Sequence, residues 1–503
     1  MAKILIIGGG VSGLSAGIYA QLNGHHAVVC EKHFVAGGNL TGWDRNGYHM
    51  DNCIHWLTGT NPATKTYKMW EDLGALGDVE VFQGESLYTY EYNGTTLSLY
   101  KDLHRIEREM LAISPKDKKE IKSLIHAIEV MQGICGIAGE GHDEKLTATK
   151  TVFSIPAMMK YYGLTTGELA ARFSHPLLRS FISAFWGDDF GSLALLMVFA
   201  HFCGENGGIP KGSSCAMAER MSKRFKELGG ELLLRKEAIK VNHENGKANS
   251  VTFADGTTIE ADYVILTADP AVVFKKLLDI PMPKQLEKKY QNTHLRRFSS
   301  YQCAFACDLA ELPFQGDFIF EVPTEYHSML HMNQVIVREF SHEPSFAPEG
   351  KNILQTLTFC YEEDAMKFIE LRNQDKQAYR RKKQEIADLL MHLLVEKLPQ
   401  FQGKLTCVDV WTPATYKRYT DSEMGSYMSF ALPSKMLPTR ASNRVKWLSN
   451  VILATQWQQI PGGLPIAAEG GKIAVETIVK QESKVRAMTV KKQKVYVKKI
   501  KEV

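Results

Sequence analysis

Several features that would narrow the function of this 503-residue chain are scarce in its sequence. No apolar run approaches the roughly 18 residues that a membrane-spanning helix needs. The N-terminus, "MAKILIIGGG", runs from a short apolar strand straight into glycines, so we expect no signal peptide. The net charge is only +4, which is too mild to indicate a nucleic-acid partner. With 44% hydrophobic and 23% charged residues, the composition is that of an ordinary globular protein with a large core.

The cysteines form no recognisable metal-binding or disulfide pattern. There are nine of them, an odd number, at irregular spacing. The closest pair, Cys303 and Cys307, has no Cys or His cluster beside it that would complete a zinc site. We therefore predict no metal site, and free thiols in a reducing cytoplasm.

One segment departs from the even charge balance, namely the C-terminal tail at 484–503. It carries eight Lys and Arg residues against the single acid Glu502. Such a run attracts an anionic membrane surface, or it is simply a solvated tail or an edge strand. Peripheral membrane contact through this tail is therefore one of the two interpretations that the sequence leaves open.

Two kinds of sequence alternate along the chain. Short apolar runs and helix patterns typical of a parallel α/β sheet occur in three segments, at about 1–84, 203–275 and 415–483. Hairpin signals and helix-like stretches lie between them. The clearest hairpin signal is Asn93-Gly94 within "SLYTYEYNGTTLSLY".

The chain opens with a glycine fingerprint between a predicted strand at 2–7 and a predicted helix from 12 to about 23. Gly8, Gly10 and Gly13 form G-x-G-x-x-G, in which the glycines permit a tight turn, close approach of a pyrophosphate and close packing of helix on strand. The helix N-terminus offers free N–H groups to phosphate. Glu31, at the end of the next predicted strand, is placed to accept hydrogen bonds from ribose hydroxyls and would repel a 2′-phosphate.

The fingerprint alone does not choose between NAD and FAD. A second glycine pair, Gly37-Gly38, follows the acid, and a lone NAD unit needs no such loop. We find no second G-x-G-x-x-G and therefore expect no separate nicotinamide domain. Serine-hydrolase chemistry has little support, since "GSSCA" lacks the surrounding G-x-S-x-G elbow.

From this point the sequence resembles a known family. "EKHFVAGGN" is similar to the E-K-x-x-x-x-G-G-R signature of FAD-containing amine-oxidase-like flavoproteins. "GYHMDNCIHWLTG", "GGIPKGSSCAMAERM", "VTFADGTTIEADYVILTADP" and "PGGLPIAAEGGKIA" resemble, in order, segments of the phytoene desaturase, carotenoid isomerase and retinol saturase group. The resemblance covers nearly the whole chain.

The resemblance implies an α/β plus α+β architecture with a Rossmann-like FAD-binding domain assembled from three segments, 1–84, 203–275 and 415–483. The segments 85–202 and 276–414 would form an inserted antiparallel-sheet substrate domain with a helical lid, followed by the basic tail at 484–503.

The resemblance also implies the residues that hold FAD. Ser12 would lie at the pyrophosphate turn, Glu31 at the ribose, and Gln456 and Trp457 at the flavin end. The full predicted set is Gly8, Gly10, Ser12, Gly13, Glu31, Lys32, Gly37, Gly38, Asn39, Ile239, Gln456, Trp457, Gly462, Gly463, Leu464 and Ile466.

Three positions depart from the family pattern. Asn39 replaces the usual Arg of the loop, Thr455-Gln456 replaces the usual Gly-Asp, and Cys53 replaces the Gly of D-x-G. Asn39 and Gln456 can still hydrogen-bond, although they carry no charge.

The predicted function is an FAD-dependent oxidoreductase that introduces or reduces a carbon–carbon double bond in a lipophilic substrate, such as a polyene, a retinoid-like compound or an unsaturated fatty acid. His55 and Trp56 are the candidate catalytic residues, and a packing role for His55 is an equal alternative. The apolar stretches at 153–164 and 181–202 are candidate pocket linings, and an ordinary core position is the more common role of such residues. A non-redox isomerase or hydratase, and a lipid-binding membrane-docking protein with a vestigial flavin fold, are the alternatives. The sequence does not identify an electron partner.

Overall fold

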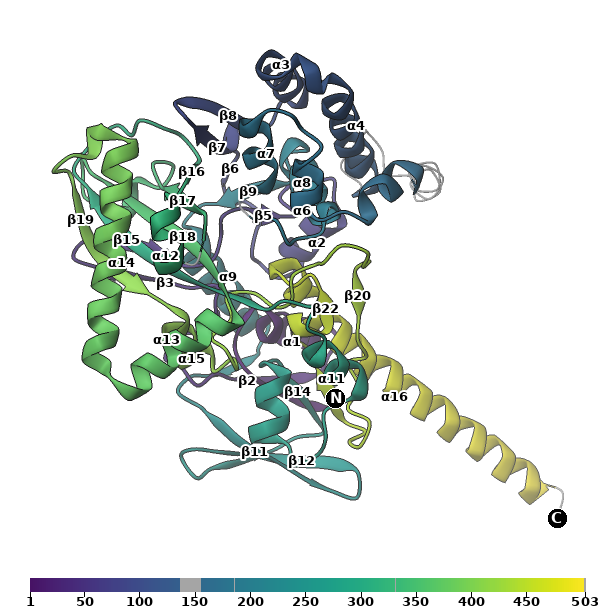
Figure 1. The fold of residues 1–503 in the computed structure, drawn as a ribbon. Coiled ribbons are helices and arrows are strands. Elements are labelled where there is room, and N and C mark those ends of the chain that lie inside the picture. Colours follow the sequence, from purple (N-terminus) through teal and green to yellow (C-terminus); the bar gives the residue numbers. More distant parts are fainter. Residues whose placement is uncertain (136–154, 185, 331, 502–503) are drawn as a thin grey trace.

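A computed structural model describes residues 1–135, 155–184, 186–330 and 332–501, with side chains described as far as residue 487. Figure 1 shows two sheets with their helices, a group of helices beside them, and one long helix that projects from the body. The start of this long helix packs against the start of the chain, where the hydroxyls of Ser12 and Ser15 donate hydrogen bonds to its backbone carbonyls.

The first sheet is parallel and has five strands in the order β10-β2-β1-β14-β21. Its strands are β1 (Lys3–Ile7), β2 (His26–Cys30), β10 (Glu231–Leu233), β14 (Tyr263–Leu266) and β21 (Val451–Leu453). The apolar, β-branched character of these short strands follows from burial on both faces. The predicted opening unit is therefore confirmed as β1, α1 (Val11–Leu22) and β2.

Helices cover one face of this sheet, and a small antiparallel sheet lies against the other. The helices are α1, α2 (Lys65–Asp72), α9 (Ser213–Glu227) and α16 (Leu464–Lys501). The small sheet comprises β11 (Ala238–Glu244), β12 (Lys247–Phe253) and β13 (Thr258–Glu260). The basic tail continues α16, so the edge-strand interpretation of that tail is wrong.

The second sheet has seven strands in the order β19-β15-β18-β17-β16-β7-β8 and is antiparallel except between β16 and β7. The strands are β7 (Ser86–Tyr92), β8 (Thr95–Tyr100), β15 (Phe298–Cys307), β16 (Asp317–Glu321), β17 (Gln334–Glu339), β18 (Asn352–Tyr361) and β19 (Leu405–Trp411). The predicted hairpin at Asn93-Gly94 is confirmed as the turn between β7 and β8, and both residues have positive φ.

Each face of the second sheet is covered by helices. One face packs against α13 (Glu362–Gln374) and α14 (Lys376–Lys397). The other packs against the helical group of α3 (Leu103–Ile113), α4 (Lys118–Ile134), α6 (Thr166–Ala170), α7 (Pro176–Ser183) and α8 (Ser192–Cys203). Further helices in the described residues are α10 (Pro270–Val272), α11 (Lys284–Gln291), α12 (His327–Leu330) and α15 (Pro413–Thr420), and residues 155–162 are also helical.

Seven further short strands in the described part of the chain lie near the two sheets. β3 (Gly42–Arg45) pairs with β4 (Tyr48–Asp51), and β20 (Thr439–Arg440) pairs with β22 (Gln459–Ile460). β9 (Gly207–Pro210) joins β5 (Leu57–Thr58) and β6 (Val81–Phe82). The pairing of β5 with β9 joins the segment after β4 to the segment after α8, next to the cavity described below.

Candidate functional site

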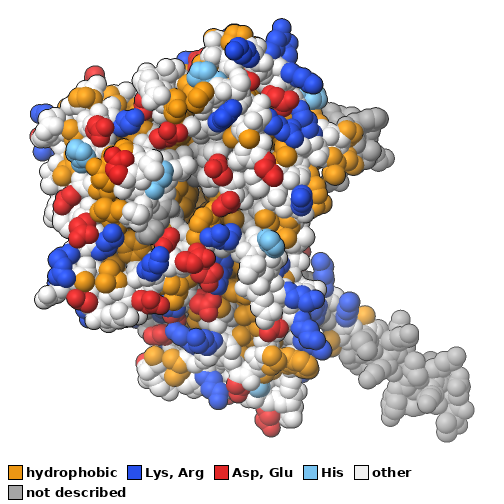
Figure 2. Space-filling view, in the orientation of Figure 1, with side chains coloured by type: hydrophobic (Ala, Val, Ile, Leu, Met, Phe, Trp, Pro, Cys, Tyr) orange, Lys and Arg blue, Asp and Glu red, His pale blue; other side chains and the backbone are white. Residues whose placement is uncertain are grey.

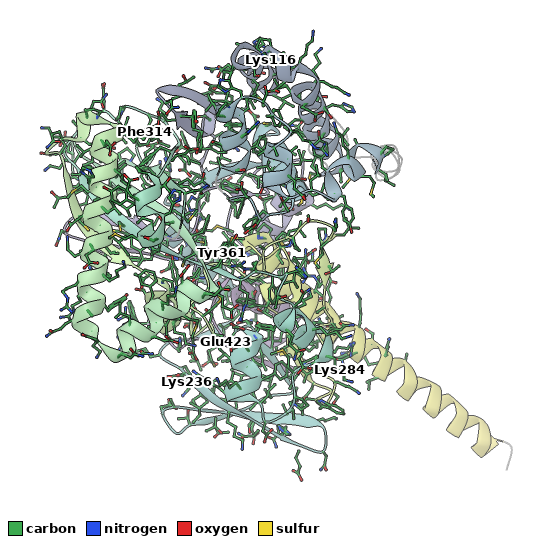
Figure 3. The ribbon with its side chains drawn as sticks, in the orientation of Figure 1. Lys116, Lys236, Lys284, Phe314, Tyr361 and Glu423 are labelled. Atoms are coloured by element: carbon green, nitrogen blue, oxygen red, sulfur yellow. The ribbon has the colours of Figure 1, made fainter. Side chains whose placement is uncertain are left out.

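A cavity of about 830 Å³ extends from the turns of the five-stranded sheet to the inner face of the seven-stranded sheet. This volume is in the range of sites that bind cofactors and their substrates. In Figure 3, Lys236 marks the end near β11, and Tyr361 marks the last residue of β18 in the seven-stranded sheet. One end of the cavity, called here the nucleotide end, lies at the carboxyl ends of the parallel strands, where it is lined by Ile7, Cys30 and Thr267. Ligands bind at this edge in such sheets.

The glycine turn after β1 opens onto the cavity. Gly8 and Gly10 line it, and Gly10 pairs with Gly37 in an isolated parallel bridge that brings the two glycine loops together. Gly13 does not line the cavity but packs against the turn. A Cβ at this position would lie 1.9 Å from the carbonyl oxygen of Gly8 and would push α1 away from the turn. The first N–H groups of α1 therefore stay close enough to receive a phosphate.

Glu31 ends β2 at the same edge and is held in place by backbone groups. The Gly9 N–H donates to its Oε2 at 2.7 Å, and the His33 N–H donates to its Oε1 at 2.9 Å. The residue is 6% exposed and lines the cavity. A carboxylate oxygen accepts more than one hydrogen bond, so this side chain keeps acceptor capacity for ribose hydroxyls.

Asn39 takes the place of the arginine that is usual in the family pattern, and its amide is bound to the backbone of a neighbouring loop. Its Nδ2 donates to the carbonyl oxygen of Tyr427 at 3.2 Å and lies 3.4 Å from that of Ser426. Its Oδ1 is buried and has no hydrogen-bond partner among the described residues. A buried acceptor without a partner costs free energy, so this oxygen suits a donor on a bound ligand.

The glycine turn before α16 closes the other end of the nucleotide region. Gln456 Oε1 accepts a hydrogen bond from the Gly463 N–H at 3.1 Å, directly before α16 begins at Leu464. The uncharged amide at position 456 therefore organises the turn, and the N-terminus of the 38-residue helix α16 lies at the cavity. A helix N-terminus stabilises negative charge placed next to it.

The loop after β4 is fixed from two sides. Asp51 accepts hydrogen bonds from the backbone N–H and the hydroxyl of Ser214, both at 2.8 Å, at the start of α9. From β17, the buried Arg338 donates to the carbonyl oxygens of Asp51 and Ile54. The following residues, His55 and Trp56, thus lie on a rigid loop, and both line the cavity.

His55 is held by an acid from the other sheet. Its Nδ1 lies 3.5 Å from Oδ2 of Asp317 on β16, and the two side chains are 7% and 13% exposed. Burial, followed by the nearby Arg338 guanidinium, lowers the pKa of His55, while Asp51 acts in the opposite direction. The imidazole is therefore neutral at physiological pH, which is the form that both accepts and donates a proton.

The far end of the cavity is apolar and aromatic. Trp186 stacks on Phe359 with ring centroids 6.2 Å apart, and Phe190 meets Phe298 edge to face at 5.7 Å. Trp56, Met197 and Val198 complete this region, together with further residues of the apolar stretch at 181–202. The pocket-lining interpretation is confirmed for these residues, whereas Leu195 and Phe199 of the same stretch belong to the core.

The companion prediction for the stretch at 153–164 is wrong for its described part. None of its described residues lines the cavity, and Ile155 and Met159 are 49% and 58% exposed. Its first two residues, 153 and 154, lie outside the described part of the chain. An apolar composition does not distinguish a cavity wall from an outer helical surface, which explains the error.

The structure brings the predicted cofactor residues together around one cavity, with Gly13 behind the turn as the exception. The residues lining it are Gly8, Gly10, Ser12, Glu31, Lys32, Gly37, Gly38, Asn39, Ile239, Gln456, Trp457, Gly462, Gly463, Leu464 and Ile466. Sequence reasoning missed Asp317, Arg338, Phe298 and Phe359. These four lie in ordinary strand sequences. Packing places Phe298 and Phe359 in the cavity wall. It also places Asp317 against His55 and Arg338 against the loop before it.

Comparison with known proteins decides the family. The pattern of the family described as "Flavin containing amine oxidoreductase" matches residues 11–479 of this chain. The chain belongs to this family. The predictions of a flavoenzyme and of FAD as its cofactor are thereby confirmed. The glycine loops, Glu31 and the buried acceptor of Asn39 fit FAD, since they offer N–H groups to phosphates and acceptors to hydroxyl or amide donors.

The chain is also similar, at low sequence identity, to enzymes named for carotenoid substrates. The chain is 24% identical over 448 residues to a chloroplastic prolycopene isomerase of Daucus carota, covering 84% of this chain and 71% of that protein. It is 22% identical over 500 residues to a lycopene-forming phytoene desaturase of a Paracoccus species, covering 94% and 97% respectively.

A solved structure confirms the predicted fold class of this flavin-containing amine oxidoreductase family member. An oxidoreductase from Methanosarcina mazei aligns with a TM-score of 0.61 at 16% identity, over 95% of this chain and all of that one. In the described part of the chain, no helix is both long enough and apolar enough to cross a membrane. The same residues contain no cluster of three or more side chains suited to a metal ion.

Proposed function

We propose that the protein introduces or reduces a carbon–carbon double bond in a lipophilic polyene, by hydride transfer to or from FAD. The observation that carries this proposal is a single cavity that joins the nucleotide turns to an aromatic chamber. Bound FAD supplies a ring that accepts or returns a hydride. Two relatives are named for prolycopene and phytoene, and these names support a polyene as the substrate class.

The chain's own residues would contribute binding, orientation and exclusion of water. The residues predicted from the resemblance would hold the cofactor, and Trp56, Trp186 and Phe359 would hold a flat conjugated chain by stacking. Such walls place a substrate carbon against the reacting ring and keep water away from it.

We also propose the domain division that the sequence suggested. All strands of the five-stranded sheet come from 1–84, 203–275 and 415–483, and all strands of the seven-stranded sheet come from 85–202 and 276–414. The first set would form the FAD-binding domain and the second set the substrate domain with its helices.

The location in the cell belongs to the proposal as well. Free thiols at all nine cysteines support a reducing compartment such as the cytoplasm. The basic continuation of α16 supports peripheral contact with an anionic membrane, from which a lipophilic substrate would be taken.

A non-redox isomerase is the second candidate. It is favoured by the similarity to prolycopene isomerase and by the neutral Gln456, which replaces an acid at the flavin end. In that case bound FAD would supply reversible chemistry without net transfer of hydrogen, and the substrate would keep its mass.

One experiment separates the two candidates. The purified protein is loaded with FAD, reduced or left oxidised under anaerobic conditions, and incubated with cis-polyenes before mass spectrometry. A change of two hydrogens supports the redox reaction. A changed double-bond geometry at unchanged mass supports isomerisation. The variant Trp186→Ala, which opens the aromatic chamber, should lower turnover with either outcome while FAD stays bound. Unaltered polyenes under both conditions would contradict both candidates.

A further inference from the structure

A second, smaller cavity lies behind His55. It has a volume of about 40 Å³, and its polar lining comes from Asp317, Glu339 and His342, with Phe82 and Gly316 beside them. Among the described residues, His55 alone lines both this cavity and the large one. The imidazole therefore forms part of the wall between them.

The small cavity has the properties that a buried water needs. Both ring nitrogens of His342 are buried and have no hydrogen-bond partner among the described residues. The volume exceeds the roughly 10–15 Å³ that one water requires, and Asp317 and His342 supply polar partners. Phe82, which stacks on His342, is 43% exposed, so this cavity lies close to the molecular surface.

The charged groups around the pair come from several elements. Asp317 belongs to β16, Arg338 and Glu339 to β17, and Asp51 to β4. Arg338 is engaged by the backbone carbonyls of the loop before His55. Glu339 accepts hydrogen bonds from the Gly316 N–H and from Ser341. Asp317 lies within reach of His55, at 3.5 Å, and such contacts tighten when ligands bind.

We propose that His55 and Asp317 form a proton relay between the large cavity and the small one, with His55 as the catalytic residue and Asp317 as its proton partner. The proton's destination in the large cavity rests on the proposed function. When a double bond is reduced, the substrate gains a hydride from the cofactor. Its second hydrogen comes from His55, whose Nε2–H bond breaks as a C–H bond forms. Nδ1 of His55 takes the proton of Asp317. A water in the small cavity then gives Asp317 a new proton, which comes from solvent. Desaturation runs the same transfers in reverse.

The ionisation of the pair agrees with this geometry. Burial raises the pKa of Asp317 to about 7, although Arg338 and His342 act to lower it. Below pH 7 the pair therefore holds one proton on the carboxyl beside a neutral imidazole, which suits proton donation. Above pH 7 the carboxylate is free to accept one. We expect the reductive rate to fall, and the oxidative rate to rise, as the pH passes through about 7.

The test uses FAD-loaded protein without substrate, so its outcome does not depend on the polyene. Infrared spectra should show a carboxylic acid carbonyl band that disappears above pH 7 and is missing in Asp317→Asn. In ¹⁵N spectra of protein with labelled histidine, the His55 signal is the one that is missing in His55→Gln. Its chemical shift should change over the same pH range. That change should be lost in Asp317→Asn. With an active substrate, both variants should lower kcat about 100-fold at little change in KM.

Asp308→Asn is the matched control, since Asp308 is an acid at the end of β15 that pairs with Lys351 at the surface. It should leave the carbonyl band, the ¹⁵N signals and kcat unchanged. A carbonyl band or a His55 transition that persists in Asp317→Asn would overturn the relay. If Asp317→Asn does not retain FAD, His55→Gln decides, because removal of the imidazole should shift the Asp317 band. An unshifted band would then overturn the proposal.

Discussion

Glu31 shows at the residue scale how one side chain links the fold to the cofactor. Its two oxygens hold the N–H groups of Gly9 and His33, so the carboxylate both shapes the glycine turn and faces the cavity. Hydrogen bonds to a charged group contribute about 1.5–3 kcal/mol each, which corresponds to roughly 10- to 100-fold in affinity.

We therefore expect Glu31→Ala to weaken FAD binding by about 10- to 100-fold, as measured by titration of flavin fluorescence. Glu231→Ala is the control, because Glu231 begins the neighbouring strand β10 and is exposed. It should bind FAD like the unmodified protein. An unchanged affinity in Glu31→Ala would show that the carboxylate does not face the ribose.

At the element scale, the packing of α1 against α16 joins the two ends of the cofactor site. Ser12 donates to the carbonyl oxygen of Ala467 at 2.9 Å, and Ser15 donates to that of Ala468 at 2.6 Å. Gly471 lies at the closest approach, where a Cβ would be 2.4 Å from the carbonyl oxygen of Ser12. One turn of helix therefore sets the distance between the pyrophosphate turn and the flavin end.

Gly471→Ala should lower the free energy of unfolding by about 1–3 kcal/mol, because the added methyl overpacks this contact. Gly470→Ala is a close control, since a Cβ at position 470 meets nothing nearer than 3.7 Å. The control should be neutral or stabilising by up to about 1 kcal/mol, as alanine favours a helix. Urea unfolding measures both variants, and equal midpoints would contradict the packing argument.

At the scale of the whole molecule, α16 carries the basic tail away from the folded body (Figure 1). On the face shown in Figure 2, basic and acidic side chains are interspersed, so the described part of that face presents no uniformly basic surface. The described side chains at the start of the tail, 484–487, are exposed. This arrangement supports the proposed contact of the tail with an anionic surface, which would not involve the core.

Removal of residues 484–503 should leave the melting temperature and FAD content unchanged, because the described side chains of this segment bury little area. It should abolish sedimentation with vesicles that contain anionic phospholipid, since each basic residue contributes about 1 kcal/mol near such a surface. Two controls use the full-length protein, one with neutral vesicles and one with anionic vesicles at high salt. The protein should not sediment with the vesicles in either control. Equal binding of both proteins to anionic vesicles would exclude the tail as the contact.

The sequence by itself determined the cofactor end of this protein. A phosphate-binding turn depends on glycines and an acid at short spacing, so Gly8, Gly10, Gly37 and Glu31 are visible in the linear chain. The same local signals predicted the first β-α-β unit and the hairpin at Asn93-Gly94.

Only the tertiary structure decided the reacting end. His55 meets Asp317 across 262 positions of sequence, and the chamber combines Trp186 with Phe359 from different elements. No periodicity encodes such contacts, because they depend on how the two sheets and the helical group pack together. The described part of the apolar stretch, 155–164, shows the same limit, since only packing places it away from the cavity. Burial, which sets the pKa of Asp317, exists only once those layers have closed around it.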